Sequence, residues 1–286
     1  MSVKNCVRAI VILFFIVNNL FSQNKFENYQ FRLVDKEASK SGIYTISQDQ
    51  LGFMWMGTNG AGLYKYDGVN YIAYEQNSKL KNSINSNLIY ATYVDTRNRL
   101  WIGTDEGLCL YNRNLDNFES IDIQKKIKKE TVISIKSIIE DNNGNLMLGT
   151  VNNGLLKLNT TTREITKVHS DVPNNSNYLI NSLAKDKKGT IYLGTNLGLK
   201  IFDPIKNETK KVDIDNDSRI HSASIVSMCL DSNQNLWIGD GFKGLIKVDL
   251  HSKVKQAFFY PITKKGLCQF WQRIPKQFFV LPKMMV

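Results

Sequence analysis

The amino-acid sequence predicts an all-β fold, a β-propeller built of four-stranded antiparallel blades, with about five blades present. Two observations predict it. One pattern returns at a fixed spacing, and each copy holds four strand-like runs without helical periodicity. The glycine that closes the second run stands at Gly57, Gly103, Gly149, Gly194 and Gly239, at spacings of 46, 46, 45 and 45 residues. A period of about 45 residues is typical of solenoids, propellers and other repeat arrays.

Each copy carries three further marks around that glycine. An aspartate stands eight residues before it, at Asp49, Asp95, Asp141, Asp186 and Asp231. A large side chain stands two residues before it, at Trp55, Trp101, Met147, Tyr192 and Trp237. A Gly-Leu pair follows four or five residues after it, beginning at Gly62, Gly107, Gly154, Gly198 and Gly244. Five copies with the same spacing of these residues would not arise by chance, so we interpret the copies as structural repeats.

The first copy shows how one repeat is built. The strand-like run GIYTISQD (Gly42–Asp49) ends in the turn DQLG. The stretch GFMWMGTNGAGLYKYDG (Gly52–Gly68) then predicts two strands joined by a tight glycine-bearing loop, and YIAYE predicts a fourth strand. Four strands and no helix in each period favour a propeller blade over a helical solenoid. We therefore expect blades near 43–75, 88–123, 132–168, 179–212 and 224–258, in a propeller region that spans 23–258.

The repeated residues have structural tasks in such a blade. The aspartate can accept hydrogen bonds from backbone N–H groups of the turn that it opens. The tryptophans, such as Trp101, are expected to fill the space between neighbouring sheets. Gly57 and its equivalents let another part of the chain approach where a side chain would clash. We assign these positions to stability and not to a binding site.

The two ends of the chain differ from the repeats. Residues 1–22 have a positive start at Lys4 and Arg8, an apolar run and a small residue, Ser22, which together predict a secretory signal peptide. The apolar run is too short to span a bilayer comfortably, although an uncleaved anchor stays an alternative. No other segment suggests a membrane span. Residues 259–286 form a basic tail without repeat marks, and we expect that this tail results from truncation or a frame shift.

Charge and cysteine content exclude two classes of protein. The net charge is +11, but two basic residues lie in the first 22 positions and seven follow His251, which leaves 28 basic against 26 acidic residues between them. No basic stripe runs along the blades, so nucleic acid is not expected as a partner. Cys109, Cys229 and Cys268 would remain after export, and three cysteines do not form a disulfide framework. We expect Cys109 and Cys229 to be buried apolar residues.

The sequence offers little sign of catalysis. The histidines His169, His221 and His251 do not recur with the repeat, and no nucleophile or zinc motif is present. The run DIDNDS (Asp213–Ser218) resembles a calcium loop but lacks the glycine and glutamate that the loop requires, so a solvated loop is favoured. We therefore predict no catalytic residue, no metal site and no cofactor.

A ligand, if one binds, should meet the face of the propeller where the first strands start. The residues expected there are Tyr44, Asn87, Tyr90, Tyr178 and His221. Tyrosines beside amides suit a sugar, because aromatic rings stack on its C–H faces while hydroxyl and amide groups bond its polar groups. The alternative for each of these residues is an ordinary place in the core or in a loop, since tyrosine is common in strands.

The repeat resembles that of a known family. In Ile46–Gly68 the order Asp-x-x-Gly, a tryptophan between hydrophobic residues, Gly-Thr, Gly-Leu and a final YDG is similar to the two-component regulator propeller repeat. The resemblance covers about Phe31 to Phe258. It implies the periplasmic sensor region of a Bacteroidetes hybrid two-component system, usually two seven-bladed propellers before a membrane helix, a histidine kinase and a receiver.

The resemblance also implies what this chain would do. Such sensors mostly bind oligosaccharides released from polysaccharides, and a homodimer would pass the signal inward. Five repeats suggest an incomplete ring and a truncated piece of a longer sensor, itself without a kinase or receiver and not an enzyme. Two alternatives stay open: a propeller that binds proteins without a small ligand, and a streptogramin lyase-like or glycan-acting enzyme.

Overall fold

The structure is a computed structural model that describes residues 41–124, 132–170, 178–212, 224–241, 244–250 and 255–258. The predicted signal peptide, the calcium-like loop, His221 and the basic tail lie outside these residues. Nowhere in the described ranges does a helix combine the length and the hydropathy needed to cross a bilayer.

The described strands form five separate sheets, which confirms the predicted number of blades. The first sheet holds β1 (Ile43–Gln48), β2 (Met54–Thr58), β3 (Leu63–Tyr66) and β4 (Tyr71–Tyr74). The second holds β5 (Ile89–Val94), β6 (Leu100–Thr104), β7 (Gly107–Asn112) and β8 (Asn117–Ile121). The third holds β9 (Ile135–Glu140), β10 (Leu146–Thr150), β11 (Leu155–Leu158) and β12 (Ile165–Lys167). The fourth holds β14 (Ile180–Lys185), β15 (Ile191–Thr195), β16 (Gly198–Asp203) and β17 (Glu208–Lys211), and the fifth holds β18 (Ile225–Leu230), β19 (Asn235–Asp240), β20 (Gly244–Asp249) and β21 (Lys255–Phe258).

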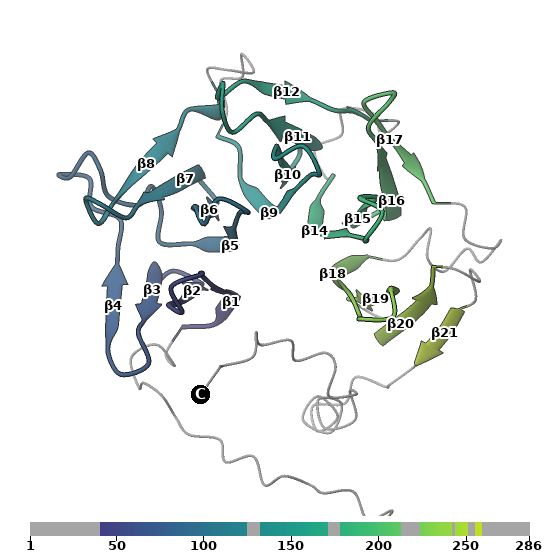
Figure 1. The fold of residues 1–286 in the computed structure, drawn as a ribbon, viewed down its shortest axis with the longest axis horizontal. Coiled ribbons are helices and arrows are strands. Elements are labelled where there is room, and N and C mark those ends of the chain that lie inside the picture. Colours follow the sequence, from purple (N-terminus) through teal and green to yellow (C-terminus); the bar gives the residue numbers. More distant parts are fainter. Residues whose placement is uncertain are drawn as a thin grey trace, which may run out of the picture. The chain divides into compact units, whose positions relative to one another are not determined.

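Consecutive strands pair antiparallel within each sheet, so every sheet is a simple meander. One strand departs from this plan, because β13 (His169–Ser170) pairs in parallel with the outer edge of β17 and adds a fifth strand to the fourth sheet. Figure 1 shows the sheets around a common axis, with β1, β5, β9, β14 and β18 innermost. The four sequential pairs of these inner strands are in contact, from β1 with β5 to β14 with β18. The all-β propeller predicted from the sequence is thus confirmed.

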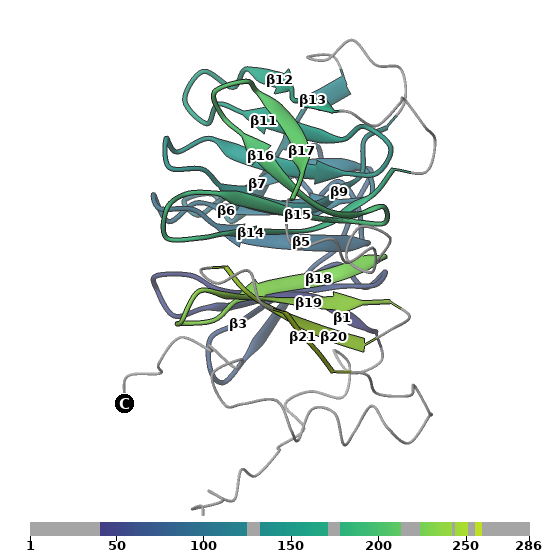
Figure 2. The same cartoon turned by 90° about the vertical axis from the view of Figure 1, so that its right-hand side faces the viewer.

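Among the described residues the core consists of four apolar clusters, one at each junction between consecutive blades. The cluster between blades 2 and 3, for example, joins Trp101 and Leu108 to Ile135 and Leu148. Trp55, Trp101 and Met147 are fully buried, as the structural role of these positions requires. Figure 2 shows the last junction from the side, where β18 lies next to β14 and β15. Blade-to-blade packing of apolar side chains is therefore the main stabilising contact of the fold.

The repeated glycine holds neighbouring blades close together. A Cβ at Gly57 would lie 2.5 Å from Cγ2 of Ile89, the first residue of the next blade's inner strand. The isoleucine at the equivalent position of blade 5, Ile225, meets the glycine of blade 4 in the same way. Its Cγ2 would lie 2.5 Å from a Cβ at Gly194. Such distances are shorter than any real carbon contact, so only glycine allows this approach. The last glycine, Gly239, meets no such isoleucine within the described residues.

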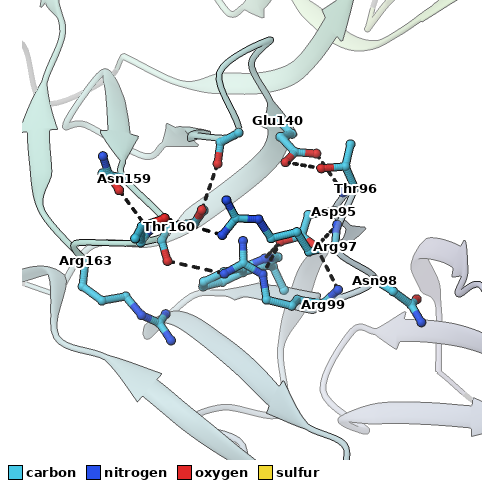
Figure 3. Close-up of polar contacts among 12 residues, drawn as sticks. Asp95, Thr96, Arg97, Asn98, Arg99, Glu140, Asn159, Thr160 and Arg163 are labelled. Carbon is cyan, nitrogen blue, oxygen red and sulfur yellow. Dashed lines mark hydrogen bonds and ion pairs between the residues drawn. The ribbon is translucent and has the colours of Figure 1, made fainter.

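The repeated aspartate organises the turn between the first two strands of each blade. Asp95 Oδ1 accepts hydrogen bonds from the backbone N–H groups of Arg97 (3.0 Å) and Arg99 (2.8 Å). Its Oδ2 accepts from Arg99 Nε at 2.6 Å and from the indole Nε1 of Trp101 at 2.9 Å. Figure 3 shows this turn facing Thr160 of the next blade, whose carbonyl oxygen accepts from Arg99. The Asp95 carboxylate thus links the turn to the buried indole ring of Trp101 and, through Arg99, to the next blade.

Cys229 corrects one expectation. Cys109 is buried as predicted, but Cys229 is exposed. Its equivalent one blade earlier, Ala184, is 6% exposed because blade 5 covers it. The first blade shows the complementary effect, since Ile43 is 43% exposed whereas Ile89 is fully buried. Repeat position alone therefore does not predict burial in the first and last described blades.

Candidate functional site

Every inner strand contains a β-bulge at the same repeat position. The pairing of β1 with β2 skips Tyr44, because Ile43 pairs with Thr58 and Thr45 with Gly57. The skipped residues in the five blades are Tyr44, Tyr90, Lys136, Asn181 and Val226. We call these five residues the bulge row. Bulges redirect side chains and are common beside binding sites, so the bulge row is the candidate functional site.

Three members of the bulge row meet across two blade junctions. The rings of Tyr44 and Tyr90 stack with their centroids 6.0 Å apart and their planes 13° apart. The ammonium group of Lys136 lies 4.0 Å from the centroid of the Tyr90 ring, which is a favourable cation–π distance. Tyr90 is thus contacted from blade 1 and from blade 3. Tyr44 is 52% exposed and presents the accessible aromatic surface.

Burial changes the acid–base properties of this group. Burial raises the pKa of Tyr90, with smaller contributions from the negative charge of Asp105 and from Tyr44. Burial lowers the pKa of Lys136. Asp105 lies in the turn between β6 and β7, and its Oδ1 is buried without a hydrogen-bond partner among the described residues. The site therefore combines an aromatic surface with an ammonium donor, and the charge of Asp105 acts on Tyr90.

The other half of the bulge row is less polar. Asn181 Nδ2 donates a hydrogen bond to the carbonyl oxygen of Ile225 at 2.8 Å, which ties blade 4 to blade 5. Val226 is 51% exposed and supplies an apolar surface. A ligand of mixed character, with hydroxyl groups and apolar C–H faces, fits such a surface. Within the described residues no group of His, Cys, Asp or Glu side chains is placed to hold a metal ion.

The five residues expected from the sequence take different positions. Tyr44 and Tyr90 come together in the bulge row. Asn87 Oδ1 accepts from the backbone N–H of Gln76 at 2.6 Å, which is a contact that holds the loop between blades. Tyr178 is only 4% exposed and packs in the cluster between blades 3 and 4. His221 lies outside the described residues, so its role stays a prediction.

Sequence reasoning missed Lys136, Asn181 and Val226. All three could have been found by aligning the five copies on their glycines and reading the position thirteen residues upstream, which is Tyr44, Tyr90, Lys136, Asn181 and Val226. Aspartate and glycine recur in all five copies at their positions and tryptophan recurs in three, whereas this position holds four different residue types. Variation at one register position inside an otherwise regular strand was the available signal.

Comparison with known proteins finds a family model that matches a short part of this chain. The model of the family described as two component regulator propeller matches residues 83–106. A protein named histidine kinase P4 of Formosa agariphila is 39% identical over 90 residues, which are 29% of this chain and 7% of that protein. The chain thus spans a small part of this curated relative.

Solved structures share the fold. The extracellular domain of a putative hybrid two component system from B. thetaiotaomicron has a TM-score of 0.64 and 18% identity, and the match covers 84% of this chain and 31% of that one. Virginiamycin B lyase from Staphylococcus aureus has a TM-score of 0.56 and 12% identity, over 77% of this chain and 70% of the lyase. At these identities the likeness concerns the fold alone. The chain is a β-propeller, and its residues 83–106 match the two-component regulator propeller family, whose repeat its sequence resembles.

Proposed function

We propose that this chain is the extracytoplasmic ligand-binding propeller of a two-component regulator, and that it senses oligosaccharides through the bulge row. The observation that carries the proposal is the contact of Tyr44, Tyr90 and Lys136 from three consecutive blades, in a propeller of this repeat. A sugar ring would stack on the exposed face of Tyr44. Its hydroxyl groups would bond to the ammonium group of Lys136, which lies 4.0 Å from the centroid of the Tyr90 ring.

Signalling would follow from the position of these residues in different blades. A ligand that contacts both Tyr44 and Lys136 bridges blades 1 and 3. It would therefore favour one arrangement of the blades over another, and such a difference in affinity between two states is what a signal requires. Location in the periplasm and association as a homodimer belong to the same proposal.

Calorimetric titration with a panel of neutral and uronate-bearing oligosaccharides tests the proposal. We expect one class to bind, and Tyr44→Ala to weaken that binding about tenfold, because loss of one aromatic stack is worth roughly 1.4 kcal/mol. Tyr71→Ala is the matched control. Tyr71 stacks on Tyr66 in the outer strands of the same blade, with centroids 4.4 Å apart, and lies outside the bulge row.

Two results would contradict the proposal. One is that no oligosaccharide in the panel binds the purified chain. The other is that Tyr44→Ala and Tyr71→Ala bind a ligand equally well. Binding of a protein instead of any glycan would favour the interaction platform, and turnover of a glycan or a streptogramin would favour an enzyme.

A further inference from the structure

A pocket lies at the outer rim of the junction between blades 1 and 2, away from the bulge row. Its volume is about 470 Å³, within the range of roughly 300–1,000 Å³ that is usual for small-ligand sites. Tyr74 and Glu75 of blade 1, Asp116 and Phe118 of blade 2, and Lys81 of the connecting loop line it. Nothing in the proposed sensing role uses this pocket.

A carboxylate held by two phenols is the central feature of the pocket. Tyr74 and Tyr111 both donate hydrogen bonds to Asp116 Oδ1, at 2.6 and 2.5 Å. Asp116 Oδ2 has no hydrogen-bond partner among the described residues, and Asp116 is exposed. Desolvation acts to raise the pKa of Asp116, but the hydrogen bonds from Tyr111 and Tyr74 and the charge of Lys65 lower it overall. Asp116 therefore stays ionised with one oxygen available.

The same positions are hydrocarbon at the other junctions. Tyr74 and Tyr111 correspond to Ile121 with Leu158, to Val168 with Phe202, and to Val212 with Val248. These pairs pack in the clusters of the later junctions without a hydroxyl group. A purely structural junction thus needs no phenol. The two hydroxyl groups of the first junction need another explanation, and the carboxylate that they hold supplies it.

The walls of the pocket are aromatic and fixed in place. The rings of Tyr74 and Phe118 meet edge to face with centroids 5.3 Å apart, and Phe118 is 4% exposed. The connecting loop is tied to the same blade, because the backbone N–H of Phe118 donates to the carbonyl oxygen of Asn82 at 2.9 Å. A site that is already formed loses less entropy when it binds a ligand.

The charges decide which ligand fits. The lining holds two carboxylates, Glu75 and Asp116, against one ammonium group, Lys81. Carboxylates are acceptors only, and aromatic rings attract cations. We propose that this pocket binds a ligand with an ammonium or guanidinium group, which bonds to Asp116 Oδ2 and lies against the rings of Tyr74 and Phe118. The source of that group is a small free amine or the side chain of a basic residue in a protein.

Titration of the whole chain with three probes tests this inference. Putrescine represents a free amine, N-acetyl-arginine amide represents a protein side chain, and 1,4-butanediol has the length of putrescine without its charge. We expect at least one of the two cations, putrescine or the arginine amide, to bind, and butanediol not to bind. The cation that binds more tightly indicates whether the natural ligand is a free amine or a protein side chain. Tyr44→Ala should leave amine binding unchanged, so this test is independent of the proposed sensing function.

A matched pair of variants locates the binding. Asp116→Asn should weaken amine binding about tenfold or more, the usual effect of losing a charge-assisted hydrogen bond. This variant should fold, because Asn207 occupies the equivalent turn position with a φ of 52°, close to the 49° of Asp116. Asp67→Asn, in an exposed turn of blade 1, should have no effect. Equal binding by the two variants, binding of butanediol as tight as that of putrescine, or no binding of either cation would overturn the inference.

Discussion

We expect Asp95 to contribute far more to the free energy of unfolding than an ordinary surface aspartate does. Its side chain is fully buried and accepts four hydrogen bonds, including one from the indole of Trp101. Asp95→Ala leaves the Trp101 Nε1–H without an acceptor in a residue that is 0% exposed, and it separates the charge of Arg99 from its partner. Breaking a buried pair in this way costs about 3–5 kcal/mol. That is a large part of the roughly 5–15 kcal/mol that stabilises a typical domain.

Denaturation with urea, followed by far-ultraviolet circular dichroism, measures this loss as a change in midpoint at constant slope. Trp101→Phe keeps one aromatic ring but removes the indole donor and part of the buried ring volume, so it should cost less than the roughly 3–5 kcal/mol expected for Trp101→Ala. Asp67→Ala is the control, because Asp67 also accepts backbone hydrogen bonds in a turn but is exposed. A midpoint for Asp95→Ala equal to that of Asp67→Ala would refute the reasoning.

Three other predictions concern packing, reactivity and pH. Gly57→Ala should lower the free energy of unfolding by about 1–3 kcal/mol through the clash with the next blade, while Gly239→Ala, whose nearest obstacle is the movable Ser227 hydroxyl, should cost less in the same denaturation assay. Peptide mass spectrometry after brief alkylation should find Cys229 modified before Cys109, since burial raises the pKa of the Cys109 thiol to about 12; equal labelling would count against the packing described. Burial and the hydrogen bond to Asp116 raise the pKa of Tyr111 to about 12, so stability present below pH 10 should be lost as the pH rises through 12, and Tyr111→Phe should flatten that loss.

The fold could be predicted from the sequence because its determinants are local and repeated. Each copy contains, within about 45 residues, the residues that predict its strands, its turn and its glycine, and the same pattern occurs in all five copies. The contacts between blades were harder to predict from the sequence. The indole bond from Trp101 to Asp95 could be suspected from their constant spacing of six residues, but the meeting of Gly57 with Ile89 depends on how two sheets pack.

The candidate site was predictable only in part. Tyr44 and Tyr90 were selected because they are aromatic and lie near strand starts, and both belong to the bulge row. Lys136 was not selected, since a lone lysine in a strand has no distinctive local signal. Tyr178 has the same residue type at a similar place in its repeat, yet it packs inside a junction at 4% exposure. The bulge decides which neighbour turns outward, and a bulge is a property of strand pairing.

The repeats also provide an internal control for assigning function. Packing demands the same chemistry at every junction, so a polar group present at only one junction is unexplained by packing. Tyr74 and Tyr111 meet this criterion at the first junction, where Asp116 joins them. Lys136 meets it in the bulge row, whereas the amide of Asn181 is explained by packing, since it donates a hydrogen bond to Ile225 of the next blade. Tyr74, Tyr111, Asp116 and Lys136 lie in blades 1 to 3, whereas the bulge-row residue of blade 5 is the apolar Val226. If ligand recognition is confined to the first three blades, substitutions there should change binding, and equivalent substitutions in blade 5 should change stability alone.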